Sequence, residues 1–393
     1  MLNTPFSPWP SFTQEEADAV SRVLLSNKVN YWTGSECREF EKEFAAWVGC
    51  DHAVALSNGT LALDVALKAL AIGEGGDEVI TTPRTFLASA SSIVTAGANP
   101  VFADVELNSQ AITLESIEAV LTPKTKAVIV VHLAGMPAEM DAIMALSEKH
   151  GFSVIEDCAQ AHGAKYKGRS VGTIGHIGAW SFCQDKIMTT GGEGGMVTTN
   201  DKDLWSKMWS YKDHGKNYDA IYNRQHPPGF RWLHDSFGTN WRMTELQAVV
   251  GRIQLTRMSE WTAKRQANAA QIDEAVADLN IVRRVHVPEH SQHAEYKHYL
   301  FVEPKHLAEG WTRDRIVETI VERGVPAYQG GSCSEVYLEK AFDNTPWRPE
   351  KRLPNAVQLG ETSLMFLVHP TLTPEEVAKI SCVIREVLLE AQK

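Results

Sequence analysis

The chain has 393 residues, of which 44% are hydrophobic and 22% are charged, values typical of a globular protein and not of a disordered or fibrous one. Its 38 basic and 49 acidic residues give a formal net charge of −11, which argues against binding to duplex nucleic acid, because that role needs a basic surface. The chain is longer than the size at which one hydrophobic core stops growing, so we expect two domains.

The sequence carries no signal for secretion or membrane insertion. The stretch MLNTPFSPWPSF lacks the basic and apolar regions of a signal peptide, and no run of 18 apolar residues occurs. The six cysteines are scattered without a C-x-x-C pair, which favours free thiols in a reducing compartment. We therefore expect a cytoplasmic protein that contacts no membrane.

The first half of the chain alternates between segments with helical periodicity and short runs of β-branched residues. Helices are expected at residues 14–26, 35–48, 60–72, 85–98, 113–121 and 139–150. Strands are expected at residues 99–105 and 125–135 and at the starts of three further segments. These segments are residues 52–60, where the strand runs into a glycine turn, residues 76–83, where it ends at a breaker, and residues 152–163, where it runs into a loop. Thr13 and Ser35 stand at the N-cap positions of the first two helices. Because the strand segments lack polar alternation, they predict a mostly parallel sheet covered by helices on both faces.

The second half begins with two further predicted strands and a glycine-rich loop. The strands are expected at residues 177–186 and 194–199, with the loop TTGGEGG (189–195) between them. Residues 216–240 are rich in Asn, His, Pro and aromatic residues and are expected to form a long loop, which in a compact domain is usually functional or disordered. A long helix begins near Thr244 and could link two domains.

Beyond that helix the sequence predicts shorter elements of both kinds. A strand is expected at residues 298–304, and helices are expected at residues 313–323 and 374–391. We therefore predict a large α/β domain that spans residues 1–258 and a smaller α+β domain that spans residues 259–393.

Ligands of open parallel sheets bind beyond the carboxyl ends of the strands, so the residues at those positions are the first candidates for a site. The first predicted strand is followed by Ser-Asn-Gly-Thr (57–60), which opens a helix and suits an anion, although an ordinary capped turn has the same pattern. The second is followed by Phe86, which could stack on a flat ring or belong to the core.

Two later strands end in residues with stronger chemistry. Glu156 and Asp157 are adjacent, and because side chains alternate along a strand, only one of them should face a ligand. Lys186 follows another strand end and precedes the glycine loop, which makes it a candidate Schiff-base nucleophile, although a lone lysine is usually a solvated surface residue. An anion-binding helix start, a stacking aromatic, an Asp and a Lys are together what pyridoxal phosphate (PLP) needs.

Longer segments around these residues resemble a known family. SNGTLALDVALKAL, VIEDCAQAHGAKYKG, GGEGGMVTTND and GTNWRMTELQAVVGRIQL are similar to segments of the DegT/StrS family of PLP-dependent sugar aminotransferases, and the likeness spans nearly the whole chain in the family's order. This resemblance implies the three-layer αβα PLP-dependent transferase fold, known as fold type I, with a smaller α+β C-terminal domain.

The resemblance also implies a role for each residue that matches the family motifs. Lys186 would hold PLP covalently and move the proton, Asp157 would pair with the pyridine nitrogen, and Phe86 would stack on the ring. Gln160 would lie near the ring hydroxyl or the far face of the ring. The phosphate would be held by Gly59, Thr60 and Ser181.

In this family a neighbouring subunit also contributes to the site. The Asn of a G-x-N-x-R segment reaches the phosphate of the partner, and here that residue is Asn240, so a homodimer with shared active sites is implied. Five further residues are candidate substrate contacts, namely His162, His214, Tyr222, Trp232 and Arg242. No metal ion is expected.

Four departures from the family pattern lie where they could shape the substrate pocket. The glycine loop is one residue longer at its start, and the segment 132–135 lacks the usual aromatic residue. Residues 216–237 are longer than in many relatives, and the segment 328–337 lacks a common Pro-x-His pattern. These departures leave the identity of the sugar open.

The resemblance implies a ping-pong transamination. L-Glutamate would leave its amino group on the cofactor as pyridoxamine phosphate, and a nucleotide-linked 4-keto-6-deoxy hexose would take it up for the amino sugars of surface glycans such as lipopolysaccharide O-antigen. A 3-keto sugar and a keto sugar without a nucleotide are alternative acceptors.

Three other functions are less favoured by the sequence. Related sugar dehydratases carry His at the position of Lys186, and a non-catalytic regulator should have lost Lys186 or Asp157. A Rossmann oxidoreductase needs a G-x-G-x-x-G motif after the first strand, and that motif is absent from the sequence.

Overall fold

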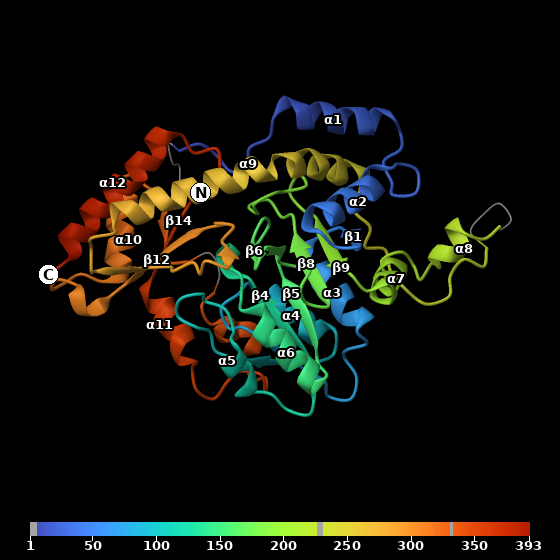
Figure 1. Ribbon diagram of the computed structural model, residues 1–393, viewed down its shortest axis with the longest axis horizontal. Coiled ribbons are helices and arrows are strands. Elements are labelled where there is room, and N and C mark those ends of the chain that lie inside the picture. The colour runs from blue at the N-terminus through green and yellow to red at the C-terminus, as the bar shows by residue number, and fades with distance from the viewer. Residues whose placement is uncertain (1–5, 226–230, 331–332) are drawn as a thin grey trace.

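The large sheet has seven strands in the mostly parallel arrangement that the sequence predicts. The computed structural model describes residues 6–225, 231–330 and 333–393 (Figure 1). The strands lie in the order β1-β9-β8-β5-β4-β2-β3. Their bounds are β1 His52–Leu56, β2 Glu78–Thr81, β3 Asn99–Phe102, β4 Thr125–Val131, β5 Ser153–Asp157, β8 Ile177–Ser181 and β9 Gly195–Thr199. Strand β9 is antiparallel to β8 and β1, and the other neighbours pair in parallel.

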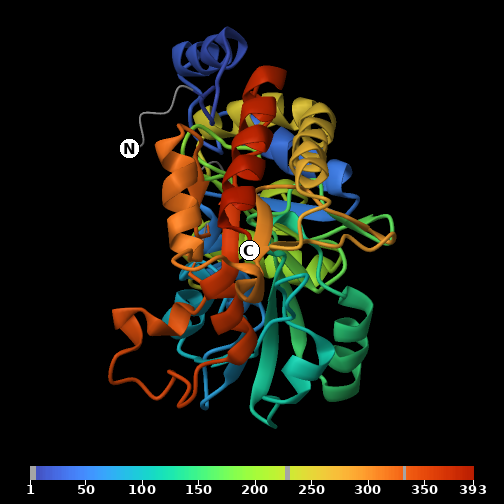
Figure 2. The same ribbon diagram turned by 90° about the vertical axis from the view of Figure 1, so that its left-hand side faces the viewer.

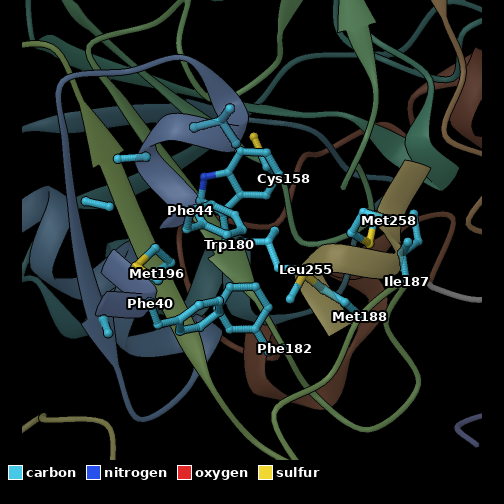
Figure 3. Close-up of a cluster of buried hydrophobic side chains, with 14 of the residues drawn as sticks. Phe40, Phe44, Cys158, Trp180, Phe182, Ile187, Met188, Met196, Leu255 and Met258 are labelled. Atoms are coloured by element: carbon cyan, nitrogen blue, oxygen red, sulfur yellow. The ribbon is translucent and has the colours of Figure 1, made fainter. Parts of the chain in front are cut away.

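Helices cover both faces of this sheet. The helices of this part of the chain are α1 Gln14–Leu25, α2 Glu36–Val48, α3 Gly59–Ala69, α4 Ala88–Thr95, α5 Leu114–Glu118, α6 Met140–His150, α7 Lys202–Tyr211, α8 Tyr218–Tyr222 and α9 Glu245–Ala275. Of these, α1 packs on α9 and α8 packs beside α7, so neither lies directly on the sheet. Trp180 of β8 packs with Phe40, Phe44 and Leu255 of α2 and α9 (Figure 3), whereas the adjacent Ala179 packs on the opposite face with residues of α3 and α7. The predicted three-layer αβα architecture is confirmed.

The first two helices begin where the sequence predicts, but they are capped in different ways. Thr13 and Glu16 form a capping box at the start of α1. Ser35 is the N-cap residue of α2, as predicted, but its side chain makes no capping hydrogen bond. The Glu245 carboxylate from the start of α9 instead accepts hydrogen bonds from the backbone N–H groups of Glu36 and Cys37. A carboxylate also suits the positive end of the helix dipole.

Helix α9 joins the large sheet to the C-terminal region (Figure 1). Met258 and Trp261 belong to the core beside β8, whereas Ala269 and Ile272 belong to the core of the C-terminal region. The predicted domain boundary at residue 258 therefore falls inside one continuous helix, close to where its contacts change from one core to the other. The division of the chain at this point stays a prediction.

The C-terminal region combines strands and helices, as predicted, and its strands form a second sheet that is antiparallel. The strands β10 Val282–Arg284, β12 His298–Val302, β14 Ser363–Phe366 and β13 Ala327–Tyr328 are neighbours in this order. The helices are α10 Arg313–Glu322, α11 Pro354–Thr362 and α12 Pro374–Ala391. Helix α12 packs against both α9 and α10 (Figure 2).

Short elements complete the described part of the chain. A three-stranded sheet pairs β11 Ser291–Gln292 with β6 Lys165–Tyr166, which pairs in turn with β7 Arg169–Ser170. Four single turns of 3₁₀ helix are η1 Leu133–Gly135, η2 Pro304–His306, η3 Val336–Leu338 and η4 Lys340–Phe342. None of the helices in the described ranges has the length and apolar character that are needed to cross a bilayer.

Candidate active site

A pocket of about 640 Å³ lies beyond the carboxyl ends of β1, β5 and β8. It brings together seven of the eight predicted cofactor residues, namely Gly59, Thr60, Phe86, Asp157, Gln160, Ser181 and Lys186. The eighth, Asn240, is exposed and does not line this pocket. The topology thus gathers residues that are up to 127 positions apart in the sequence.

One end of the pocket is built to hold an anion. Helix α3 begins here, and the Asn58 side chain caps it by accepting a hydrogen bond from the Leu61 backbone N–H at 3.0 Å. The first N–H groups of a helix have no partner within the helix, so they can bind a phosphate together with the hydroxyls of Thr60 and Ser181. A Cβ atom on Gly59 would lie 2.5 Å from the Ser181 Cβ, so only glycine lets the two segments approach this closely. These groups fit the phosphate of PLP.

Gly59→Ala should weaken the binding of PLP. The added methyl group forces the start of α3 away from Ser181, and overpacking of this kind costs about 1–3 kcal/mol. The dissociation constant of PLP, measured by titration of the apoenzyme, is expected to rise accordingly. Thermal unfolding of the apoenzyme is the control, since a loss of PLP affinity explained by global destabilisation would contradict a specific role for Gly59.

The two adjacent carboxylates at the end of β5 point in opposite directions, as strand alternation predicts. Asp157 faces the pocket, where its carboxylate accepts hydrogen bonds from the Ser89 hydroxyl at 2.8 Å and from the Ala159 backbone N–H at 3.1 Å. Burial raises the pKa of Asp157, and these hydrogen bonds and the nearby Lys186 oppose that shift. A buried carboxylate with one side open to the pocket is suited to pair with a protonated ring nitrogen.

Glu156 is fully buried on the other side of the strand and supports the backbone. Its oxygens accept hydrogen bonds from His132 and from the N–H groups of Gly172, Ile174 and Gly175, at 2.6–2.9 Å. Burial alone raises the pKa of Glu156, but the hydrogen bonds outweigh it and hold that pKa below its usual value. Glu156, His132 and Cys158 lie close enough to bind a metal ion, but the hydrogen bonds already engage both Glu156 oxygens. We therefore interpret this group as structural.

Lys186 lies in the loop between β8 and β9, and its amine faces the pocket. The Lys186 Nζ atom lies 5.2 Å from the centre of the Tyr296 ring, and the Tyr296 hydroxyl donates a hydrogen bond to the adjacent Asp185. The Lys186 carbonyl accepts a hydrogen bond from the indole N–H of Trp9 at 2.9 Å. Burial raises the pKa of Tyr296 well above its usual value, so its hydroxyl stays a proton donor at neutral pH.

Phe86 and Gln160 complete the lining. Phe86 is 65% exposed, which excludes the alternative that it is a core aromatic, and leaves its ring free to stack on a planar group. The Gln160 side chain accepts a hydrogen bond from the backbone N–H of Ala134 at 2.7 Å. This bond ties Gln160 to the segment 132–135, where the family's aromatic residue is missing.

The five candidate substrate residues do not line the pocket of their own chain. His162 is buried against Trp180 and Phe182, and burial together with the nearby Lys186 and Arg265 lowers its pKa to about 3. The Arg242 guanidinium forms an ion pair with Asp213 at 2.6 Å. His214, Tyr222 and Trp232 are exposed, and Trp232 is 90% exposed.

A cationic group beside the pocket has no counterpart in the sequence-based prediction. Arg265 on α9 is 1% exposed, and its Nε and Nη2 atoms lack a hydrogen-bond partner. The Lys297 Nζ atom lies 4.7 Å from the centre of the same Tyr296 ring that faces Lys186. Burial lowers the pKa of Lys297 to about 8 and that of Arg265 to about 9. Neither residue forms an ion pair within the described ranges, although the Asp185 carboxylate lies near both Lys186 and Lys297, and the Glu295 carboxylate lies near Arg265.

Comparison with known proteins agrees with this geometry. The profile of the DegT/DnrJ/EryC1/StrS aminotransferase family matches residues 10–385. The chain is 35% identical over 387 residues to a UDP-N-acetyl-3-dehydro-alpha-D-glucosamine 3-aminotransferase of Acidithiobacillus ferrooxidans, which covers 98% of this chain and 96% of that protein. It is 35% identical over 357 residues to the GDP-perosamine synthase of Caulobacter vibrioides, which covers 89% of this chain and 90% of that protein.

The fold agrees with solved structures over the same length. An aminotransferase from Psychrobacter cryohalolentis superposes with a TM-score of 0.97 at 65% sequence identity, which covers 98% of this chain and 100% of that one. PLP is the cofactor of this family, and the pocket residues fit it. The chain therefore belongs to the DegT/DnrJ/EryC1/StrS aminotransferase family, and it is a PLP-dependent aminotransferase.

Proposed function

We propose that the protein transfers the amino group of L-glutamate to a nucleotide-linked keto sugar. The observation that carries this proposal is the union in one pocket of an amine, a buried carboxylate and an anion-binding helix start, contributed by Lys186, Asp157 and Gly59. The names of the relatives support a sugar acceptor, since one acts on a UDP-linked sugar and another is named for a GDP-linked sugar.

Each pocket residue has a defined task in this proposal. PLP supplies an electron sink that stabilises negative charge at the carbon bearing the amine. Lys186 would hold the aldehyde and later move a proton, Asp157 would keep the ring nitrogen protonated, and Phe86 would cover the ring. Gln160 would lie near the ring hydroxyl or the far face of the ring. The phosphate would be bound by Gly59, Thr60 and Ser181.

The cationic group beside Lys186 favours an acidic donor. Burial disfavours the charged forms of both side chains, and the Nε and Nη2 atoms of Arg265 lack a hydrogen-bond partner, so a carboxylate that reached this group would be stabilised. L-Glutamate brings two carboxylates to this place, and its amine must approach the cofactor beside Lys186. We therefore propose that Lys297, backed by the charge of Arg265, attracts a carboxylate of the donor.

Lys297→Met should impair the use of glutamate selectively. Loss of a charge-assisted contact is expected to raise the KM for L-glutamate by about 10- to 100-fold, with a much smaller change in kcat. Lys297→Arg keeps the charge and should retain most of the affinity. Isopropylamine, an amine without a carboxylate, is the control substrate, and an equal loss with this amine would contradict a role for Lys297 in binding the carboxylate.

The acceptor is proposed to be a 4-keto-6-deoxy hexose on a nucleotide, as the family resemblance implies. A second candidate is a 3-keto sugar, which the 35% identity to the UDP-N-acetyl-3-dehydro-alpha-D-glucosamine 3-aminotransferase favours. In either case the product is an amino sugar. We propose that the enzyme makes this amino sugar in the cytoplasm, and that the amino sugar is then built into surface glycans such as lipopolysaccharide O-antigen.

A panel of acceptors tests this proposal. The enzyme with PLP and L-glutamate is mixed with 3-keto and 4-keto sugars linked to dTDP, UDP, GDP or CDP, and the products are identified by mass spectrometry and NMR. Amination of one of them, with release of 2-oxoglutarate, is the expected result. If none is aminated, the nucleotide-sugar acceptor is wrong, and a keto sugar without a nucleotide, such as an oxidised octulosonate, is tested next.

We also propose that two chains share their active sites in a homodimer. Asn240 is exposed. It lies near the start of α3, since the carbonyl of the next residue, Trp241, accepts a hydrogen bond from the Ser57 backbone N–H at 3.0 Å. Trp232 and Phe237 on the same segment are 90% and 100% exposed, which is unfavourable for large apolar side chains unless another surface covers them. His214, Tyr222 and Arg242 lie near or on this segment and would approach the partner's substrate.

A further inference from the structure

The N-terminal segment of residues 7–10, here called the strap, connects the C-terminal region to the loop of Lys186. At its first end, the Ser7 backbone N–H and hydroxyl donate hydrogen bonds to the Glu376 carboxylate at 2.6 and 2.9 Å. Glu376 lies in the first turn of α12. The Pro8 carbonyl accepts a further hydrogen bond from the Thr371 hydroxyl at 2.8 Å. Three hydrogen bonds therefore fasten the strap beside α12.

Trp9 forms the other end of the strap and is held on several sides. Its ring lies edge to face against Trp261 with 5.1 Å between ring centres, and it stacks on His369 at 5.9 Å. The Arg265 guanidinium carbon lies 4.9 Å from the centre of the ring, a distance at which a cation and an aromatic face attract each other. These contacts fix the direction of the indole N–H.

That N–H donates its hydrogen bond to the backbone carbonyl of Lys186 at 2.9 Å. Lys186 lies in an irregular loop between β8 and β9, where its own N–H donates to the Cys183 carbonyl at 3.1 Å. The side chain of Lys186 is long and flexible, so the position of its backbone decides where the amine can reach. A hydrogen bond to that backbone from a side chain packed on three others is therefore a means of placing the amine.

We propose that Trp9 is a positioning residue for Lys186. Its indole N–H fixes the backbone from which the Lys186 amine reaches the cofactor and the donor carbon, and the strap fastens this arrangement to the C-terminal region. The inference rests on the proposed role of Lys186, and it predicts that loss of the N–H slows the steps that Lys186 performs without weakening the binding of substrates.

Trp9→Phe tests this inference, because phenylalanine keeps an aromatic ring at the site and loses the donor. When PLP is added to the apoenzyme, a fast non-covalent binding step should be followed by covalent capture, in which the Lys186 amine attacks the aldehyde and water leaves. Stopped-flow absorbance separates the two steps. We expect the variant to slow covalent capture by about 10-fold and to leave the first step unchanged. A misplacement of a reacting group by about 1 Å can lower a rate by roughly 100-fold, so a smaller displacement of the Lys186 amine is enough for this effect.

The reaction with L-glutamate gives a second readout. Proton transfer from the donor carbon should become slower in Trp9→Phe by a similar factor, so the kinetic isotope effect with [2-²H]glutamate should increase while the apparent Kd for glutamate stays the same. Ser7→Ala, which loosens the far end of the strap, should act in the same direction with a smaller effect. Trp47→Phe is the matched control, because Trp47 packs on the same core from helix α2.

Unchanged capture and an unchanged isotope effect in Trp9→Phe would overturn the inference. A rise in the Kd for glutamate alone would also overturn it, because Trp9 would then act on the substrate and not on Lys186. If the wild-type enzyme captures PLP covalently but reacts with no amino donor, the proposed function fails, and the capture experiment still tests Trp9.

Discussion

Lys186→Ala is expected to abolish both the visible absorbance of covalently bound PLP and the transfer of the amino group. Lys186 is the amine that faces the pocket from between β8 and β9, and we propose that it serves both as the covalent anchor and as the proton carrier. Loss of a positioned general base alone lowers a rate by about 10²- to 10⁴-fold. We therefore expect a reduction of at least about 10⁴-fold, measured as 2-oxoglutarate released from L-glutamate.

The controls for this variant separate chemistry from folding. Lys207→Ala replaces an exposed lysine on α7 and should behave as the wild type. The Lys186→Ala protein should still bind PLP without covalent attachment, because the groups proposed to hold the phosphate are intact. A small added amine such as methylamine should restore part of the rate by carrying the proton. Full activity of Lys186→Ala would exclude Lys186 as the catalytic amine.

Asp157→Asn is expected to lower the rate of amino transfer by about 10²- to 10³-fold while PLP remains covalently bound. Asparagine has the same shape, and its side-chain oxygen can still accept the hydrogen bond from Ser89. It carries no negative charge, so it cannot keep the ring nitrogen protonated, and the electron sink is weakened. The single-turnover rate with L-glutamate measures this loss.

A chemically modified cofactor gives a direct control for the role of this charge. PLP methylated on its ring nitrogen has a fixed positive charge and needs no carboxylate to maintain it. It should recover a large part of the lost rate in Asp157→Asn and bring no gain to the wild type. If the methylated cofactor does not help the variant, the charge on the ring nitrogen is not the task of Asp157.

Much of the fold could be predicted because the chain repeats a strong local pattern. Runs of β-branched residues without polar alternation, such as residues 125–131, predict buried parallel strands, and the structure confirms them. Parallel strands place their carboxyl ends along one edge, so residues just beyond each strand, such as Gly59 and Lys186, come together in one pocket. Alternation along β5 explains why Asp157 faces that pocket and Glu156 does not.

Other features could not be predicted because their causes lie far apart in the sequence. Glu245 caps a helix that begins 209 positions earlier, so no local motif marks it. Tyr296 belongs to the C-terminal region, yet its hydroxyl donates a hydrogen bond to Asp185 in the Lys186 loop, which is 111 positions earlier in the sequence. Short elements, such as the five-residue helix α8 inside the segment predicted as a loop, contain too few residues to show a period.

The residues that two chains are proposed to share could not be predicted from sequence patterns for a different reason. Asn240, Trp232 and His214 project from the surface of one chain, and their proposed partners belong to a second chain. Sequence patterns identify such residues only through resemblance to a family, because nothing within one chain buries them. A crosslink between subunits that depends on a cysteine introduced at position 240 would test this arrangement.

The most direct test of the proposed function is a single turnover with L-glutamate and no acceptor. The PLP-loaded enzyme should release one equivalent of 2-oxoglutarate per bound PLP and lose its visible absorbance in the same time course. Addition of a nucleotide-linked keto sugar should restore the absorbance and yield an amino sugar. If the absorbance persists and no 2-oxoglutarate forms, the protein is not a glutamate-dependent aminotransferase.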